Sequence, residues 1–223
     1  MKILFLSDLH LGSPLFNHKA RILSLLNDSY DTVVLIGDII DTWEGPVNYI
    51  ADEHEVLISR LNELNLVVVR GNHDPTFEVL HEIFPNASVL SEYNFEYEDM
   101  KIKATHGHEF DDLITKYYWL AKITFPIQWA LQRLGLNLKG WLRDLLHSIA
   151  AKSQDKQYHD LVNDIEKRAI EAYGERYDAV VMGHTHLPKL VEGDCIYVNS
   201  GDWISHSTYV LFEDGKFSLK GEY

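Results

Sequence analysis

The sequence predicts an α/β fold in which two facing mixed β-sheets are flanked by helices and carry a helical insert. Three observations predict it. Apolar strand-like runs alternate with helical periodicity as far as residue 83, close-set short strands dominate the stretches 94–105 and 179–219, and nothing in residues 111–174 reads as a strand. A chain of 223 residues is long enough for one large domain with a substantial core.

Strand and helix alternate in the first part of the chain. Short apolar runs rich in β-branched residues predict buried strands at 2–7, 32–36 and 66–70. Apolar residues at helical spacing predict helices at 15–27, 50–64 and 76–83. This rhythm implies parallel strands joined by right-handed crossovers. In such sheets, binding sites gather beyond the carboxyl ends of the strands.

The remainder of the main domain reads as short strands and one long helix. The predicted strands are 94–97, 100–105, 179–182, 190–191, 196–198, 208–212 and 217–219. Asp214-Gly215 is a hairpin turn between the last two. Apolar residues at helical spacing predict a helix at 158–173, which we assign to the main domain. Two facing mixed sheets are the simplest packing of these elements.

Residues 111–156 form a predicted helical insert, so that the main domain consists of 1–110 and 157–223. The insert contains three apolar helices, with aromatic residues at Tyr117, Tyr118, Trp119, Trp129 and Trp141. Seven Lys or Arg against four Asp give it a net charge of +3, whereas the rest of the chain carries −17. Its helices either pack on one another or form a cap with an apolar slot. The second alternative suits an amphiphile that carries acyl chains and a phosphate.

The amino-acid composition limits the classes of binding partner and the cellular compartment that we expect. The net charge of −14 argues against a nucleic-acid binder, which would need a basic surface. The single cysteine, Cys195, excludes an intramolecular disulfide framework and fits a reducing compartment. Neither a signal peptide nor an apolar run of transmembrane length is evident. We therefore expect a cytoplasmic protein, with peripheral contact to the inner face of a membrane through the basic insert as a further hypothesis.

Five short polar segments stand mostly at the ends of predicted strands. They are Asp8-Leu9-His10, Gly37-Asp38-Ile39-Ile40-Asp41, Gly71-Asn72-His73-Asp74, His106-Gly107-His108 and Gly183-His184-Thr185-His186. Oxygen and imidazole ligands without thiolates suit Mn, Fe, Zn or Mg. Seven such side chains are too many for one tetrahedral ion but fit two ions that share a bridging ligand. This arrangement is typical of a two-metal hydrolase.

The order of these segments resembles the calcineurin-like metallophosphoesterases from residue 1 to about residue 212. The resemblance implies two divalent ions, with Mn²⁺ as the expected metal. It also implies a first ion held by Asp8, His10, Asp38 and His186, and a second held by Asp38, Asn72, His106 and His184. Asp38 would bridge the two ions and offset the repulsion between them. For single members of the set, a helix cap at Asp38 or a turn at Asn72 is the structural alternative.

Such a centre would hydrolyse a phosphodiester or pyrophosphate bond through a hydroxide that bridges the two metals. His73 is the candidate to stabilise the transition state or to protonate the leaving oxygen. Asp74 is a candidate to orient His73, and Asp41 is a candidate to orient a ligand histidine. Loop or helix-cap roles are the alternatives for both aspartates. His108 contacts the second metal or the substrate, or satisfies the turn at Asp111-Asp112.

Two longer segments resemble the branch that contains UDP-2,3-diacylglucosamine hydrolase. They are His106-Gly107-His108-Glu109-Phe110-Asp111 before the insert, and the stretch from Gly183 to Pro188 with the later turn from Tyr197 to Trp203. The resemblance implies hydrolysis of a lipid A precursor with release of UMP. Candidate substrate-binding residues are His108, Trp129, Arg133, Arg143 and Asn199. For Asn199, a structural corner is the alternative. The best-known members carry Arg in place of His73 and Asp in place of His108.

Three other functions remain as alternatives. A soluble nucleotide or protein phosphatase would use the same metals but would not need an apolar cap. A nuclease would need basic grooves, which the strongly acidic main domain does not offer. A non-catalytic scaffold of the same fold would have lost ligands, whereas all seven ligand positions are filled here.

Overall fold

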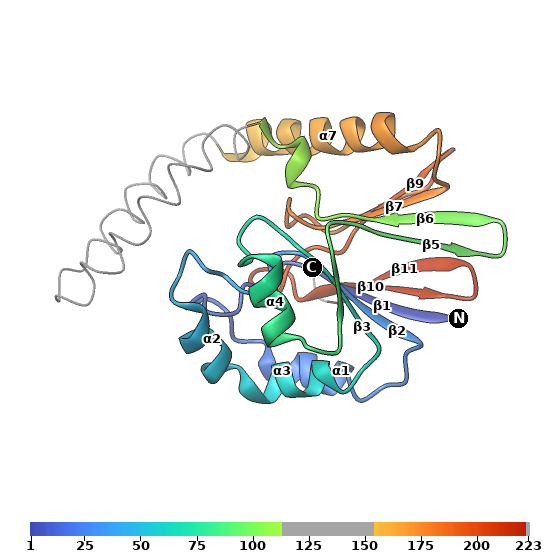
Figure 1. The fold of residues 1–223 in the computed structure, drawn as a ribbon. Coiled ribbons are helices and arrows are strands. Elements are labelled where there is room, and N and C mark those ends of the chain that lie inside the picture. Colours follow the sequence, from blue (N-terminus) through green and yellow to red (C-terminus); the bar gives the residue numbers. More distant parts are fainter. Residues whose placement is uncertain (113–153, 222–223) are drawn as a thin grey trace.

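Two β-sheets lie face to face at the centre of the molecule, and helices cover both outer faces (Figure 1). The computed structural model describes residues 1–112 and 154–221, apart from the side chains of 154–158. The first sheet has six strands in the order β11-β10-β1-β2-β3-β4. Its strands are β1 (Lys2–Leu6), β2 (Thr32–Ile36), β3 (Leu66–Val69), β4 (Ser88–Leu90), β10 (Thr208–Glu213) and β11 (Lys216–Gly221).

The second sheet has five strands in the order β5-β6-β7-β9-β8. They are β5 (Tyr93–Tyr97), β6 (Met100–Ala104), β7 (Ala179–Met182), β8 (Lys189–Val191) and β9 (Ile196–Asn199). The central strands of each sheet are parallel, while β10 and β11 in the first sheet and β5 and β8 in the second pair antiparallel. Both sheets are therefore mixed, as the sequence predicts.

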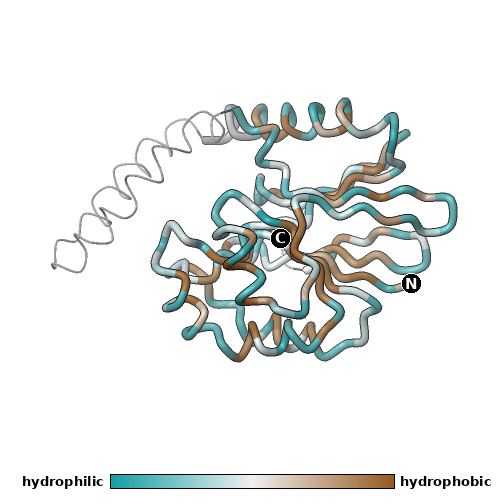
Figure 2. The backbone as a smooth tube through the Cα atoms, in the orientation of Figure 1, coloured by the Kyte–Doolittle hydropathy of each residue, from teal (hydrophilic) through white to brown (hydrophobic). Residues whose placement is uncertain are grey.

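Successive side chains along a strand point to opposite faces of the sheet, so each sheet packs against the other sheet on one face and against helices on the other. On β1, Ile3 and Phe5 point into the core between the sheets, whereas Leu4 and Leu6 point to the outer helices. The outer face of the first sheet is covered by α1 (Lys19–Leu25), α2 (Val47–Glu53), α3 (Glu55–Asn62) and α4 (Phe77–Ile83). On the second sheet, Val180 and Met182 pack under α7 (Gln154–Tyr173). Hydrophobic residues accordingly follow the strands of both sheets in Figure 2.

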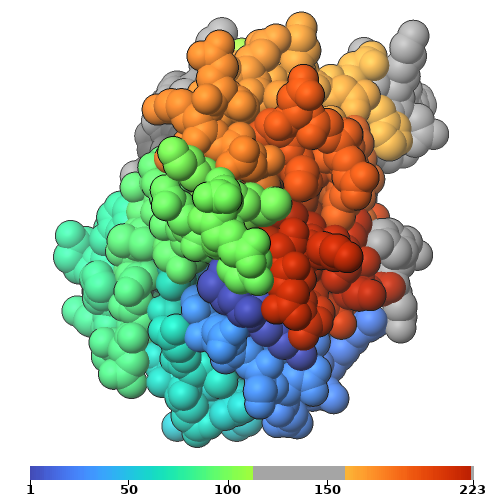
Figure 3. Space-filling view, turned by 90° about the vertical axis from the view of Figure 1, so that its right-hand side faces the viewer, coloured from blue at the N-terminus to red at the C-terminus, as the bar shows by residue number. Residues whose placement is uncertain are grey.

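Aromatic rings close one end of the core between the sheets. The hairpin β5–β6 lies against the hairpin β10–β11, green beside red in Figure 3. The ring of Phe212 meets the rings of Phe95, Tyr97 and Phe217 at centroid distances of 6.0, 5.4 and 4.8 Å. The first two contacts are edge-to-face and the third is tilted, and such aromatic pairs stabilise by about 0.5–1.5 kcal/mol each beyond the area they bury. This packing joins the two sheets on the side away from the polar cluster described below.

Two predicted helices differ from the structure, and one observed strand was not predicted. The helix expected at 15–27 covers only Lys19–Leu25. The helix expected at 50–64 is two helices that meet at His54, where the backbone leaves helical geometry and the buried ring packs edge-on against Phe16. Strand β4 was missing from the prediction because its three residues bury only Val89, which leaves no apolar run.

The prediction of a long helix at 158–173 is confirmed, although α7 begins earlier, at Gln154. The three insert helices lie outside the described residues, so the domain division stays a prediction. Across residues 1–112 and 154–221, the structure contains no helix that is both long and apolar enough to span a bilayer.

Candidate metal centre

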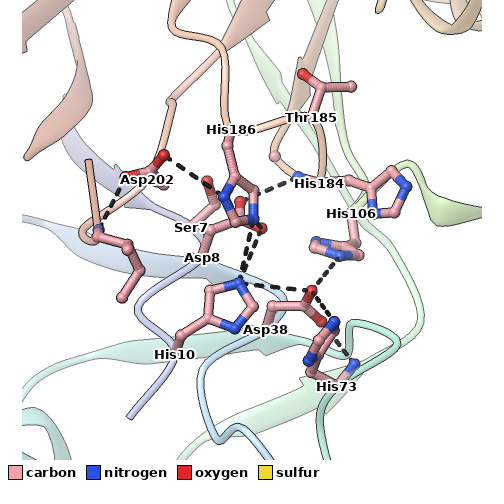
Figure 4. A network of polar contacts seen from close by, with 12 residues as sticks. Ser7, Asp8, His10, Asp38, His73, His106, His184, Thr185, His186 and Asp202 are labelled. Carbon is pink, nitrogen blue, oxygen red and sulfur yellow. Dashed lines mark hydrogen bonds and ion pairs between the residues drawn. The ribbon is translucent and has the colours of Figure 1, made fainter. Parts of the chain in front are cut away.

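The predicted ligands come together where both sheets end. Asp8 and His10 follow β1, Asp38 follows β2, and Asn72 follows β3 in the first sheet. From the second sheet, His106 follows β6, while His184 and His186 follow β7. Because these strands are parallel within their sheets, their carboxyl ends meet at one edge of each sheet. Figure 4 shows the imidazoles and carboxylates turned toward one another.

Backbone strain is concentrated at this edge. Eight residues other than glycine have positive φ angles within the described ranges, and five of them are predicted ligands. Their φ angles lie between 47° and 66°, at Asp8, His10, Asp38, His184 and His186. A left-handed conformation costs about 1–3 kcal/mol for such a residue and is characteristic of functional sites. The fold therefore bears a substantial cost to aim these side chains at one point.

Three overlapping groups of side chains could each hold a cation; two match the predicted ions, and the third, His10, Asp38 and His73, shares its first two members with them. In the first, Asp8, His10 and His186 offer ligand atoms that all lie within 4.8 Å of one another. In the second, Asp38, His106 and His184 do the same. The Asp38 carboxylate lies between the groups, since its Oδ2 is 3.2 Å from His106 Nε2 and 4.0 Å from His10 Nε2. It therefore occupies the position that a bridging ligand requires.

The amide of Asn72 belongs to the second group. Its Oδ1 lies 3.1 Å from His106 Nε2, and the residue is buried. The backbone between Asn72 and Asp38 is tied as well, because the amide of His73 donates to Asp38 Oδ1 at 2.8 Å. An uncharged oxygen at this position adds a ligand to the second group without adding charge.

Three of the four histidines have one ring nitrogen hydrogen-bonded to an acceptor outside the two groups, and the fourth, His186, has a longer ion-pair contact. Nδ1 lies 3.0 Å from Asp41 in His10, 2.9 Å from the Ile36 carbonyl in His106, and 3.5 Å from Asp202 in His186. In His184 it is Nε2 that lies 3.1 Å from Asp111. With these nitrogens as donors, the lone pairs of the opposite nitrogens are available to bind a metal.

The opposite nitrogens also crowd one another. Nε2 of His10 and Nε2 of His186 lie only 3.2 Å apart, and both face Asp8 Oδ1. Burial lowers the pKa of both His10 and His106, but neighbouring carboxylates outweigh it and raise the pKa of His10 to about 9 and that of His106 to about 10. The site is thus built for positive charge, and divalent cations fit its donor set.

Asp41 joins a predicted ligand to the predicted catalytic histidine. Its Oδ2 lies 3.0 Å from His10 Nδ1, and its Oδ1 lies 3.0 Å from His73 Nδ1. Although burial acts to raise it, these two hydrogen bonds hold the pKa of Asp41 well below its usual range. The expected contact between Asp41 and a ligand histidine is therefore present. The ring of His73 also lies against the ring of Trp43, with centroids 3.6 Å apart.

Asp74 does not orient His73, and this prediction is wrong. Its Oδ1 accepts the amides of Ile39 and Ile40 at 2.8 Å each, and its Oδ2 accepts the amide of Gly71 at 2.8 Å. Burial, together with the charge of Asp38, raises its pKa to about 6. Asp74 ties the loops after β2 and β3 together, which is the structural alternative that the sequence left open.

Asn199 is a structural corner, so the expectation that it binds substrate is wrong. Its side chain is fully buried, and Nδ2 donates to the Gly183 carbonyl at 2.7 Å and to Thr185 Oγ1 at 3.1 Å. Its Oδ1 accepts the Gly201 amide at 2.9 Å. These bonds fix the loop that carries His184 and His186, and burial keeps the amide out of reach of a substrate.

The other candidate substrate-binding residues divide into two sets. The ring of His108 lies 5.4 Å from that of His106 and 6.4 Å from that of His184, beside the second group. Burial, together with the charge of His106, lowers its pKa to about 4. Trp129, Arg133 and Arg143 lie outside the described residues.

The sequence does not reveal two carboxylates that contact predicted ligand histidines. Asp111 directly follows the His106–Phe110 segment, and Asp202 lies in the turn after β9. Both residues belong to turns next to recognisable motifs, yet nothing in the local sequence shows which imidazole a distant carboxylate reaches. Asp202 also accepts the amides of Ile204 and Ser205, so it is a turn residue and a histidine partner at once.

A cavity of about 300 Å³ opens beside the two groups. One wall is polar and includes Asp38, Asn72, His73 and His184. The opposite wall is apolar and comes from α7, through Leu161, Val162 and Ile165. A molecule in this cavity would therefore present a polar group to the histidines and carboxylates and an apolar group to the helix.

Gly71 lies where the chain after β3 comes very close to Asp38 after β2. A Cβ at this position would collide with Oδ1 and the backbone nitrogen of Asp38. We expect Gly71→Ala to lower the free energy of unfolding by about 1–3 kcal/mol through overpacking, as measured by urea denaturation without metal. Gly193→Ala is the matched control, since its Cβ would meet the Cys195 carbonyl at an ordinary 3.6 Å. Equal stability of the two variants would contradict this explanation.

Comparison with known proteins identifies the family to which this chain belongs. The family model of calcineurin-like phosphoesterases matches residues 1–188. A search of curated proteins finds no match. Among solved structures, an archaeal phosphodiesterase is 19% identical, with a TM-score of 0.54 and 99% of each chain covered. The phosphoesterase YfcE from E. coli is 20% identical, with a TM-score of 0.53 and full coverage of both chains.

A third similar structure is Vps29 from Chaetomium thermophilum, which is 12% identical with a TM-score of 0.53, over 100% of this chain and 96% of that one. At these identities the solved structures share the fold, and the family model carries the assignment. It covers most of the chain and includes all seven predicted ligands. The chain therefore belongs to the calcineurin-like phosphoesterase family and is a metal-dependent phosphohydrolase.

Proposed function

We propose that this protein hydrolyses a phosphodiester or pyrophosphate bond with two divalent ions, most favourably Mn²⁺. The observation that carries the proposal is the orientation of His10, His106 and His184, each hydrogen-bonded at one ring nitrogen so that the opposite nitrogen is left to bind a metal. The first ion would be held by Asp8, His10, Asp38 and His186, and the second by Asp38, Asn72, His106 and His184. A scaffold protein would have no need of these paired contacts.

When bound, the two ions would lower the pKa of a water and place fixed positive charge against the phosphoryl group. The chain supplies the rest. His73 lines the cavity; its Nδ1 is held by Asp41, and its Nε2 lies 3.9 Å from Asp38 Oδ2, beside the proposed ions. From there it can stabilise charge on the phosphoryl oxygens or give a proton to the leaving oxygen.

The substrate is an amphiphilic phosphoester similar to UDP-2,3-diacylglucosamine. The apolar wall of the cavity supports this part of the proposal, because Leu161 and Val162 of α7 stand opposite the polar groups. A small polar phosphoester would gain nothing from that wall, whereas an acyl chain or sugar face would be desolvated against it.

Release of UMP from UDP-2,3-diacylglucosamine by the Mn²⁺-loaded protein tests the proposal. Bis-p-nitrophenyl phosphate serves as the generic diester, and His10→Asn serves as the blank. Release that is absent in the blank supports both the chemistry and the substrate. Cleavage of the generic diester alone would retain the two-ion chemistry and overturn the lipid-sugar substrate. Cleavage of neither compound by protein that contains two ions would overturn both.

Protons and metal ions compete for this site, which gives a prediction for its pH dependence. Without metal, the pKa values of about 9 for His10 and about 10 for His106 keep both imidazoles protonated at pH 7. Each ion must displace a proton, so its apparent affinity should rise about tenfold per pH unit between pH 6 and 8 and level off as pH passes the pKa. Titration with Mn²⁺ by calorimetry in two buffers of different ionisation enthalpy measures the protons released. An affinity independent of pH would contradict the prediction.

A further inference from the structure

We infer that Asp111 is a positioning residue for the second ion and that Arg168 of α7 holds it in place. The inference rests on the proposed function, since it concerns how this chain orients one ligand of that function. The carboxylate of Asp111 is almost fully buried, and its Oδ2 lies 3.1 Å from His184 Nε2. It also lines the cavity beside the two groups.

The contact decides which nitrogen of His184 is free. With Nε2–H donating to Asp111, the lone pair is on Nδ1, the nitrogen that remains available to the second group with Asp38 and His106. The backbone of His184 is fixed separately, because its amide donates to Asp8 Oδ2 at 3.0 Å. Loss of the Asp111 carboxylate would therefore free the ring without freeing the loop.

One guanidinium holds the backbone on both sides of Asp111. Arg168 Nη1 donates to the Phe110 carbonyl at 2.7 Å, and Nη2 donates to Asp112 Oδ1 at 3.0 Å. The ring of Phe110 adds an edge-on contact with Tyr173, one turn further along α7. In Figure 1, the short helix η1 (His108–Phe110) accordingly lies beside α7. This arrangement transmits the position of α7 to His184.

The two ions differ in this respect. The carboxylates behind His10 and His186 belong to the loop after β2 and the turn after β9. Asp111 is the one carboxylate of this kind in the described part of the chain that α7 anchors. Disturbance of the Arg168 contacts should therefore weaken the second ion and spare the first.

Mn²⁺ stoichiometry and affinity of Asp111→Asn test the inference, measured by calorimetry and by EPR of the exchange-coupled ion pair. An Asn amide can turn its NH₂ toward Nε2 and favour the wrong tautomer. We expect the second ion to bind about 10- to 100-fold more weakly, with the first retained and the coupled signal lost at limiting Mn²⁺. Asp111→Glu should recover part of the affinity, because it restores an acceptor with full charge.

Arg168→Gln should shift the affinity for the second ion in the same direction but less, since it acts through the backbone. Glu171→Gln is its matched control, because this exposed carboxylate pairs only at 3.6 Å with Lys167 on the same helix. Wild-type affinity for both ions in Asp111→Asn would overturn the inference, and so would equal weakening of both ions with a lower melting temperature. Fewer than two ions in the wild-type protein would instead overturn the proposed function.

Discussion

Asp38→Asn should reduce kcat/KM for bis-p-nitrophenyl phosphate by at least about a thousandfold. Asp38 is the carboxylate between the two groups, with Oδ2 3.2 Å from His106 Nε2 and 4.0 Å from His10 Nε2. An amide offers a single neutral oxygen and leaves the repulsion between two cations without compensation. Loss of about 4 kcal/mol of transition-state stabilisation corresponds to this factor.

The metal dependence of stability separates this effect from a folding defect. A metal ion that binds the proposed centre binds the native state alone, so Mn²⁺ should raise the melting temperature of the wild-type protein and raise that of Asp38→Asn far less. Asp99→Asn is the matched control, an exposed carboxylate in the turn between β5 and β6. Wild-type turnover in Asp38→Asn, or an unchanged gain in melting temperature, would contradict the bridging position.

Buried strands were predictable because their signal is local. Residues 32–36 form a β-branched apolar run, and β2 has these same limits. Their glycine and acidic neighbours mark where each strand must end, so the ligands at the carboxyl ends could be predicted with the strands. The helix limits were harder to predict. The apolar periodicity continues through residue 54, but the helix is interrupted there, where His54 packs against Phe16, a residue distant in sequence.

The partners of the ligands could not be predicted because they are distant in sequence. His10 and Asp41 are 31 residues apart, and His184 and Asp111 are 73 apart. Asp74 illustrates the converse error, because adjacency to His73 favoured a contact that the strand packing gives to Asp41. A carboxylate close to backbone N–H groups that have no other acceptor binds these groups in preference to a neighbouring side chain. Asp74 accepts hydrogen bonds from three such amides.

His73→Gln should lower kcat by about a hundredfold to ten-thousandfold while both ions remain bound. The imidazole is held by Asp41 at 3.0 Å and by the face of Trp43, but it completes neither of the ion sites proposed here. Its loss removes a proton donor or a positive charge near the phosphoryl group and leaves the ligands intact. Steady-state kinetics together with Mn²⁺ stoichiometry measure the two effects separately.

The leaving group distinguishes the two roles of His73. If Nε2 protonates the leaving oxygen, the loss in kcat will be small for p-nitrophenyl esters and large for alkyl esters, whose oxyanions are far more basic. If it stabilises charge on the phosphoryl group, both losses will be similar. His81→Gln, at the exposed end of α4, is the matched control. Full activity of His73→Gln on both esters, or loss of an ion, would exclude a direct role in the reaction and return His73 to the structural residues around Asp41.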